Sequence, residues 1–120
     1  MKRKTVVLGA SENPERYANR AVRSLLHHDE DVVAVGLREG QIEGVKILTG
    51  KPAIENVDTV TMYVGPAHQK DWYEYVLSLK PKRIIFNPGA ENPEFEKMAE
   101  ENGIEVVEAC TLVMLSIGNY

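Results

Sequence analysis

The sequence predicts an α/β domain with a doubly wound parallel sheet, on three observations. Short runs of β-branched and other apolar residues alternate with segments whose apolar residues recur at helical spacing. The runs are almost wholly apolar, as is typical of strands that helices cover on both faces. Gly or Pro stands at or just after the ends of the first four runs. Strands that alternate with helices in this way form parallel sheets with right-handed crossovers.

Size and composition favour an ordinary globular protein. The chain has 120 residues, which we interpret as a single domain over residues 1–120. Its net charge of −4, with dispersed basic residues, argues against nucleic acid or an anionic membrane as the main partner. The single cysteine, Cys110, fits a reducing compartment, and the basic start of the chain precedes a strand-like run rather than the apolar core of a signal peptide. We therefore expect a cytoplasmic protein.

The first predicted unit is a strand at residues 5–8 followed by a helix at about 14–27. Asn13 is the expected N-cap, because Asn caps well and Pro14 loses no hydrogen bond at the first helical position. One face of this helix is apolar, and the opposite face carries Arg16, Arg20 and Arg23. The helix is thus expected to pack its apolar face on the sheet.

The remaining elements continue the alternation. Further strands are predicted at residues 31–35, 58–64, 83–86 and 104–108. Helices are predicted at about 67–79 and 93–102, and the tail at 110–117 as a last strand or short helix. Residues 36–58 have little regular pattern, with a small strand at 45–47 and one helical turn at 52–56. The expected architecture is a Rossmann-like fold with strand order 3-2-1-4-5, the third strand being 58–64.

The carboxyl ends of the first four strands converge on one crevice in such a fold. They bring together residues 9–16, 36–38, 64–66 and 87–89. The first of these segments passes from a strand through a Gly-Ala-Ser turn straight into a helix, where free backbone N–H groups favour an anion. A phosphate ligand is therefore expected at this turn.

The pattern around the turn disfavours an ordinary NAD site. The dinucleotide fingerprint needs three glycines and a carboxylate at the end of the second strand. This chain keeps only Gly9, places Ser11 and Pro14 at the other glycine positions, and has Arg38 where the carboxylate would stand. An arginine suits a phosphate carried on an adenosine ribose, which both NADP and coenzyme A possess.

These motifs, taken in order, resemble a known family. The Gly-Ala-Ser-x-x-Pro-x-Arg turn, the Asn-Arg-x-Val-x-x-Leu-Leu helix, the Val-Gly-Leu-Arg end of the second strand, Tyr63-Val64-Gly65-Pro66 and Glu108-Ala109-Cys110 are similar to the small bacterial coenzyme A-binding domain family. That family is similar in fold to the nucleotide-binding domains of the succinyl-CoA synthetase α subunit and of ADP-forming acyl-CoA synthetases. The resemblance covers essentially the whole chain.

The resemblance implies a set of ligand-binding residues. Gly9 would let the pyrophosphate approach the backbone, Ala10 and Ser11 would supply N–H or hydroxyl donors, and Arg16 would pair with a phosphate. Residues 36–38 would border the adenosine, 64–66 would close the adenine side, and 87–89 would lie along the pantetheine. The expected site residues are Gly9, Ala10, Ser11, Asn13, Arg16, Gly36, Leu37, Arg38, Val64, Gly65, Pro66, Asn87, Pro88 and Gly89. Glu12 and Glu15 add negative charge beside this site, so their side chains are expected to point to solvent.

The sequence predicts binding rather than chemistry. No Ser-His-Asp set, paired carboxylates or Walker lysine is visible, and His27, His28 and His68 lack metal-ligand spacing. The leading hypothesis is a non-catalytic module that binds coenzyme A or a short acyl-CoA, as a sensor, a carrier or a regulator of a partner enzyme. One alternative is an NADP-dependent oxidoreductase, motivated by Arg38. Another is an interaction domain with a degenerate nucleotide pocket. If the ligand thiol reached Cys110, a mixed disulfide would be a further hypothesis.

Overall fold

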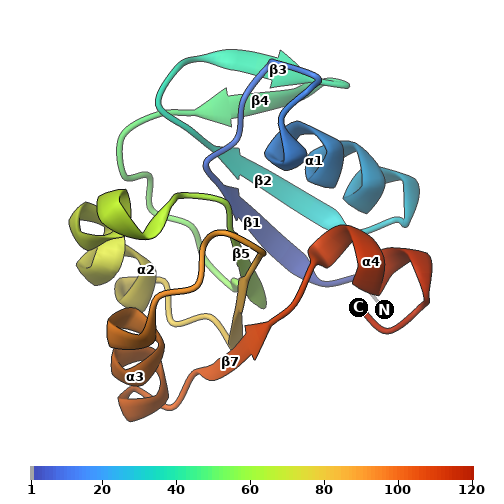
Figure 1. Ribbon diagram of the computed structural model, residues 1–120. Helices are drawn as coiled ribbons and strands as arrows, with labels where there is room; N and C mark the ends of the chain where they lie inside the picture. The colour runs from blue at the N-terminus through green and yellow to red at the C-terminus, as the bar shows by residue number, and fades with distance from the viewer. Residues whose placement is uncertain (1) are drawn as a thin grey trace.

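A seven-stranded sheet runs through the centre of the molecule, with α1 and α4 on one face and α2 and α3 on the other (Figure 1). The computed structural model describes residues 2–120, so Met1 lies outside the described residues. The strands, in chain order, are β1 (Lys4–Leu8), β2 (Asp31–Val35), β3 (Gly40–Ile42), β4 (Val45–Leu48), β5 (Thr59–Met62), β6 (Arg83–Phe86) and β7 (Glu105–Glu108). All pairs are parallel except β3 with β4. The Rossmann-like α/β class is confirmed.

The strand order differs in one detail from the prediction. The order is β3-β4-β2-β1-β5-β6-β7. The segment expected as the third strand, β5, lies beside β1 rather than outside β2, with Thr5 opposite Thr59 and Leu8 opposite Met62. The outer position next to β2 belongs to β4, which forms a hairpin with β3. The small strand predicted at residues 45–47 corresponds to β4. Its partner β3 was not predicted, because it has only three residues and is buried through packing near α1.

Helix α1 (Tyr17–His27) begins later than predicted, and its N-cap is Arg16 rather than Asn13. The Asn13 side chain instead accepts a hydrogen bond from the Glu15 N–H at 3.0 Å, while its carbonyl accepts one from the Arg16 N–H at 3.0 Å. Asn side chains compete with helix formation through such local turns. Arg16 therefore precedes the first helical turn in which it was expected. The predicted apolar face is buried, and it comprises Ala18, Ala21, Val22 and Leu25.

The second half of the chain contains shorter helices than predicted. The expected helix at 67–79 is divided into a 3-10 helix, η1 (Pro66–Trp72), and α2 (Tyr73–Ser78). Helix α3 (Pro93–Glu101) begins at the predicted proline, and the tail forms the short helix α4 (Thr111–Ser116). The expected helical turn at 52–56 is irregular backbone.

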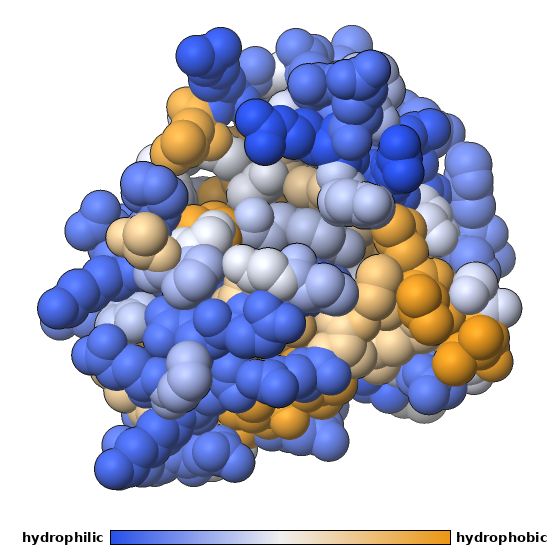
Figure 2. Space-filling model, viewed as in Figure 1, coloured by the Kyte–Doolittle hydropathy of each residue, from blue (hydrophilic) through white to orange (hydrophobic). Residues whose placement is uncertain are grey.

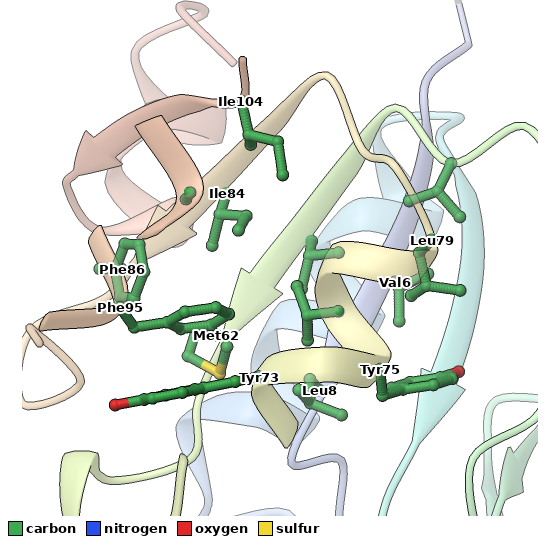
Figure 3. Packing of buried hydrophobic residues seen from close by; sticks show 14 of the residues in the cluster. Val6, Leu8, Met62, Tyr73, Tyr75, Leu79, Ile84, Phe86, Phe95 and Ile104 are labelled. Carbon is green, nitrogen blue, oxygen red and sulfur yellow. The ribbon is translucent and has the colours of Figure 1, made fainter. Parts of the chain in front are cut away.

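The larger core cluster holds the strands against α2 and α3 (Figure 3). Tyr73 stacks on Phe95 with ring centroids 4.4 Å apart, and Phe86 meets the same ring edge-on at 5.8 Å. Val6 and Leu8 point to this side of the sheet, whereas Val7 packs with α1 on the other. Side chains that alternate between the two faces of β1 thus pack against both helical layers. This packing holds the carboxyl ends of the strands in place.

The two ends of the chain meet on the α4 face (Figure 1). The hydroxyl groups of Thr5 and Tyr120 hydrogen-bond each other, and the Arg83 guanidinium lies over the Tyr120 ring at 4.5 Å. Val113 of α4 and Ile117, directly after this helix, leave an exposed apolar patch (Figure 2). Among residues 2–120, no helix has the length and apolar character needed to cross a membrane.

Candidate functional site

A pocket of about 1030 Å³ opens at the carboxyl edge of the sheet, where the four predicted segments meet. We call residues 9–18 and 36–38 the arginine wall, and residues 62–72 and 87–90 the amide wall. Every predicted site residue lines the pocket except Pro66. Pro66 is exposed and stands at the first position of η1, where its fixed φ helps that helix to begin. The structure thus brings the other predicted residues together around one pocket.

The turn after β1 is tightly bound to the sheet. Gly9 has φ 102°, and a Cβ placed there would lie 3.2 Å from the Tyr63 carbonyl carbon. The N–H groups of Gly9 and Ala10 both donate to the Val35 carbonyl at 2.9 Å. The Ala10 N–H, expected as a donor to a phosphate, is therefore paired within the sheet in this structure. Ser11 differs: its hydroxyl oxygen accepts from the Asn13 N–H at 3.1 Å, which leaves the hydroxyl hydrogen free to donate.

The N-terminus of α1 faces the pocket without a side-chain cap. No side chain bonds the N–H groups of its first turn, and that turn contains no acidic residue. Tyr17 and Ala18, the first two helical residues, line the pocket. Unpaired N–H groups and the helix dipole together favour an anion at this point.

Two arginines add full positive charge to the same wall. Arg16 and Arg38 are exposed and line the pocket. Over residues 2–120 the ion pairs are Arg3 with Asp58 and His27 with Glu43, so both arginines remain unpaired with carboxylates. This arrangement offers charge-assisted hydrogen bonds to phosphate groups.

The acidic residues of the turn have separate positions. The Glu12 carboxylate accepts a hydrogen bond from the Gln41 N–H at 2.9 Å and lies against Gly40, at the β3 edge. The Glu12 carboxylate is thus bound to the β3–β4 hairpin. Glu15 is exposed and remains among the lining residues.

The end of β2 approaches the β1 turn closely. A Cβ at Gly36 would lie 2.3 Å from the Ala10 carbonyl oxygen, so only glycine fits there without a backbone shift. The next residue, Leu37, is 86% exposed, and Tyr17 is 64% exposed, although both are large and apolar. Exposed apolar side chains on a pocket wall provide contact area for an apolar or aromatic part of a ligand.

The amide wall contains lining residues that sequence reasoning missed. His68, Asp71 and Trp72 come from η1, and Tyr63 and Ala90 from the ends of the neighbouring loops. A signal for the first three was present in the sequence, because Asp71 and Trp72 follow His68 by three and four residues, a spacing that places side chains on one side of a helix. Trp72 is partly buried and lies edge-on to Tyr75 at 5.8 Å. It belongs to both the pocket and the core.

Asn87 has a structural role that the sequence did not indicate. Its side chain is 2% exposed and donates to the Thr61 hydroxyl at 2.7 Å and the Met62 carbonyl at 2.9 Å. Its side-chain oxygen accepts from the Thr111 N–H at 2.9 Å. The amide is thus committed to β5 and α4, which leaves Pro88 and Gly89 as the exposed rim of this loop.

Two further groups near the site lack an assigned role. The Tyr63 hydroxyl is buried without a hydrogen-bond partner, and burial raises the pKa of this phenol. Cys110 is partly exposed and does not line the pocket, so the geometry gives no support to a mixed disulfide with a bound thiol. Among residues 2–120, no three His, Cys, Asp or Glu side chains are grouped to hold a metal ion.

Comparison with known proteins gives one family. A family model described as CoA binding domain matches residues 3–116. No curated protein sequence matches the chain.

Solved structures resemble this one over nearly its whole length. An uncharacterized protein with a crystal structure has 49% sequence identity and a TM-score of 0.97, over 100% of this chain and 99% of that chain. A Thermus thermophilus protein has 28% identity and a TM-score of 0.86, over 99% of this chain and 91% of its own. A dinucleotide-forming acetyl-coenzyme A synthetase from Ca. Korarchaeum cryptofilum has 19% identity and a TM-score of 0.72, over 88% of this chain and 25% of its own. The last likeness is one of fold alone.

Proposed function

Because the chain belongs to the family of CoA binding domains, we propose that its pocket binds coenzyme A or a short acyl-CoA. The observation that carries this proposal is the coincidence of an uncapped helix N-terminus with two unpaired arginines in one pocket. Coenzyme A carries a pyrophosphate and a separate phosphate on its adenosine ribose, so it can use both kinds of group. The charges of the wall and of the ligand are complementary.

We assign the parts of the ligand to the two walls by their chemistry. The pyrophosphate would meet the Ser11 hydroxyl, the first turn of α1 and Arg16, and the ribose phosphate would meet Arg38. Tyr17 and Leu37 would flank the adenine, in keeping with their exposure. The pantetheine arm would run along Pro88 and Gly89.

In this proposal the protein is a sensor, a carrier or a regulator of a partner enzyme, and it acts in the cytoplasm. The residues of the pocket hold phosphates and present apolar surface, which is the chemistry of binding. An NADP-dependent oxidoreductase remains the second candidate, favoured by Arg38 at the end of β2.

Isothermal calorimetry with four ligands tests the proposal: coenzyme A, dephospho-coenzyme A, NADP and NAD. We expect coenzyme A to bind most tightly and to raise the unfolding temperature, because a ligand that binds only the native state stabilises it. Preference for NADP would support the second candidate. No binding of any of the four would contradict both and leave the degenerate interaction domain.

The variant Arg38→Ala tests how much the contact with the ribose phosphate contributes to coenzyme A affinity. We expect about tenfold weaker binding of coenzyme A, as for one lost charge-assisted hydrogen bond. Binding of dephospho-coenzyme A, which lacks that phosphate, should be unchanged. Lys46→Ala, at an exposed position outside the pocket, is the matched control. Equal losses of affinity for both ligands would mean that Arg38 contacts a part of coenzyme A other than the ribose phosphate.

A further inference from the structure

A fully buried glutamine joins the two loops of the amide wall. Gln69 lies on η1 with no solvent exposure. Its side-chain nitrogen donates to the Val64 carbonyl at 2.8 Å and to the Ala90 carbonyl at 2.7 Å. Both acceptors belong to residues that line the pocket, one after β5 and one after β6. Glutamine is seldom fully buried, because its polar atoms must all be paired.

The second half of this linkage is Asn92. Its side-chain nitrogen donates to the Gln69 side-chain oxygen at 3.0 Å and to the Tyr73 hydroxyl at 2.8 Å. Its side-chain oxygen accepts from the Phe95 N–H at 3.2 Å, at the start of α3. Every polar atom of the two amides has a partner, and the two backbone carbonyls fix which end of Gln69 is the nitrogen.

The position of the Gln69–Asn92 pair matters because the hydrogen bonds of the sheet end just before the two loops begin. Strands β5 and β6 pair from Thr59 opposite Arg83 to Met62 opposite Phe86. Beyond Met62 and Phe86, strand pairing no longer sets the distance between the segment after β5 and the segment after β6. Gln69 takes over that task from the side of the core, by bonding to one carbonyl on each loop.

We propose that Gln69 is a positioning residue for ligand binding: with Asn92, it fixes the separation of the residue 64–65 loop from the residue 88–90 loop. This inference rests on the proposed function, since the ligand concerned is coenzyme A. A pocket whose walls are fixed before binding spends less ordering entropy when the ligand enters. The arginine wall then supplies charge, and the Gln69–Asn92 pair supplies shape.

The test uses Gln69→Met, which retains the length and volume of the side chain and removes the amide. Tyr75→Phe is the matched control, because the Tyr75 hydroxyl also donates to a backbone carbonyl, that of Pro52 at 2.6 Å, which does not line the pocket. Measured by calorimetry well below both unfolding temperatures, Gln69→Met should bind coenzyme A about tenfold or more weakly, because the two bonds to the loop carbonyls and the bond from Asn92 are all lost. Tyr75→Phe should bind as the wild type does.

A second variant keeps the test decisive if Gln69→Met does not fold. In Gln69→Glu the ionised carboxylate has no proton to donate to either carbonyl, whereas the protonated acid has one. The affinity ratio between wild type and Gln69→Glu should therefore shrink as the pH is lowered. If Gln69 served stability alone, the stability of Gln69→Glu would vary with pH, but the affinity ratio would stay constant.

Hydrogen exchange in the ligand-free protein separates the two proposals. In Gln69→Met, exchange should rise together at residues 64–68 and 88–91 and stay unchanged at residues 9–16. A wild-type protein that binds no coenzyme A contradicts the proposed function, and exchange then decides the role of Gln69. Unchanged coenzyme A affinity in Gln69→Met, or exchange that rises in one loop only, overturns the inference.

Discussion

The two walls of the pocket differ in how their side chains are used. On the arginine wall, Arg16 and Arg38 are exposed and free of carboxylate partners. On the amide wall, Gln69 and Asn87 are buried: the Gln69 side chain donates to the Ala90 carbonyl, and the Asn87 side chain donates to the Met62 carbonyl. Asn92, just beyond this wall, is also buried, and its side-chain oxygen accepts from the Phe95 N–H. Over the described residues, the arginines of one wall have no carboxylate partner, whereas the buried amides of the other are hydrogen-bonded within the protein.

Polar residues at a pocket are therefore not equivalent candidates for ligand binding. An exposed arginine costs the fold little when it is removed, because solvent already screens it. A buried amide leaves unpaired partners behind, and each unpaired buried group costs free energy. Substitutions on the arginine wall should therefore lower ligand affinity more than stability. Substitutions of the buried amides should lower stability more than affinity.

The largest expected effect is on the amide wall. Asn87→Ala leaves the Thr111 N–H and the Met62 carbonyl without their partner, so we expect the free energy of unfolding to fall by about 2–4 kcal/mol. Urea denaturation measures this change. Asn13→Ala, on the exposed turn of the arginine wall, is the control and should cost less than about 1 kcal/mol. Similar losses for both variants would remove the proposed distinction between the walls.

The next effect concerns the one place where the arginine wall is tightly packed. Gly36→Ala would put a Cβ 2.3 Å from the Ala10 carbonyl oxygen, so the β1 turn must shift. We expect a stability loss of about 1–3 kcal/mol together with weaker coenzyme A binding.

Gly65→Ala is the control for this prediction, because nothing lies within 4 Å of its added Cβ and its φ of −62° suits alanine. Its stability should be equal to or slightly above that of the wild type. Thermal unfolding that does not distinguish Gly36→Ala from Gly65→Ala would contradict the close approach of β2 to the turn.

A variant that affects binding alone comes third. Arg16→Ala should leave the unfolding free energy within about 0.5 kcal/mol of the wild type. Its coenzyme A affinity should fall by about tenfold or more, corresponding to about 1.5–3 kcal/mol for a charge-assisted bond. Lys46→Ala is the control, since Lys46 is exposed and does not line the pocket. Calorimetry that finds equal affinities for the two variants would exclude Arg16 from the site.

The smallest effect is expected at the opposite edge of the sheet, where no ligand is proposed. Burial raises the pKa of Asp58, but hydrogen bonds from Thr59 and Arg3 outweigh it, so the pKa lies below its usual value of 3.8. A lowered pKa in the folded state gives stability that is present above the unfolded pKa and is lost as the pH falls through the folded value. For this partly exposed pair the contribution should be below about 1 kcal/mol.

Asp58→Asn should accordingly flatten the acid limb of the stability curve and leave coenzyme A affinity unchanged. Urea midpoints measured across the acid range give the first quantity, and calorimetry at neutral pH gives the second. An altered affinity would show that the two edges of the sheet are coupled.

Local sequence signals predicted most of the arginine wall, but on the amide wall they predicted the strand-end residues and missed those on η1. The Gly-Ala-Ser turn, Arg16 and Arg38 are close to strand ends, where pattern alone locates them. The roles of Gln69 and Asn87 depend on partners 21 to 26 residues away, such as the Ala90 carbonyl and the Thr61 hydroxyl. Sequence spacing contains no record of such pairings. The N-cap of α1 was also missed, because the choice between two neighbouring turns depends on how Asn13 bonds locally.

The alternation of strands and helices, the parallel sheet and the edge that holds the pocket follow from the sequence. They depend on hydrophobic periodicity and on turn residues, which act over a few positions. The place of β4 beside β2, the pairing of the Ala10 N–H with Val35, and the burial of Gln69, Asn87 and Asn92 become apparent in the folded molecule. Those outcomes depend on which backbone groups are left unpaired once the sheet is assembled, and that is settled by contacts between distant parts of the chain.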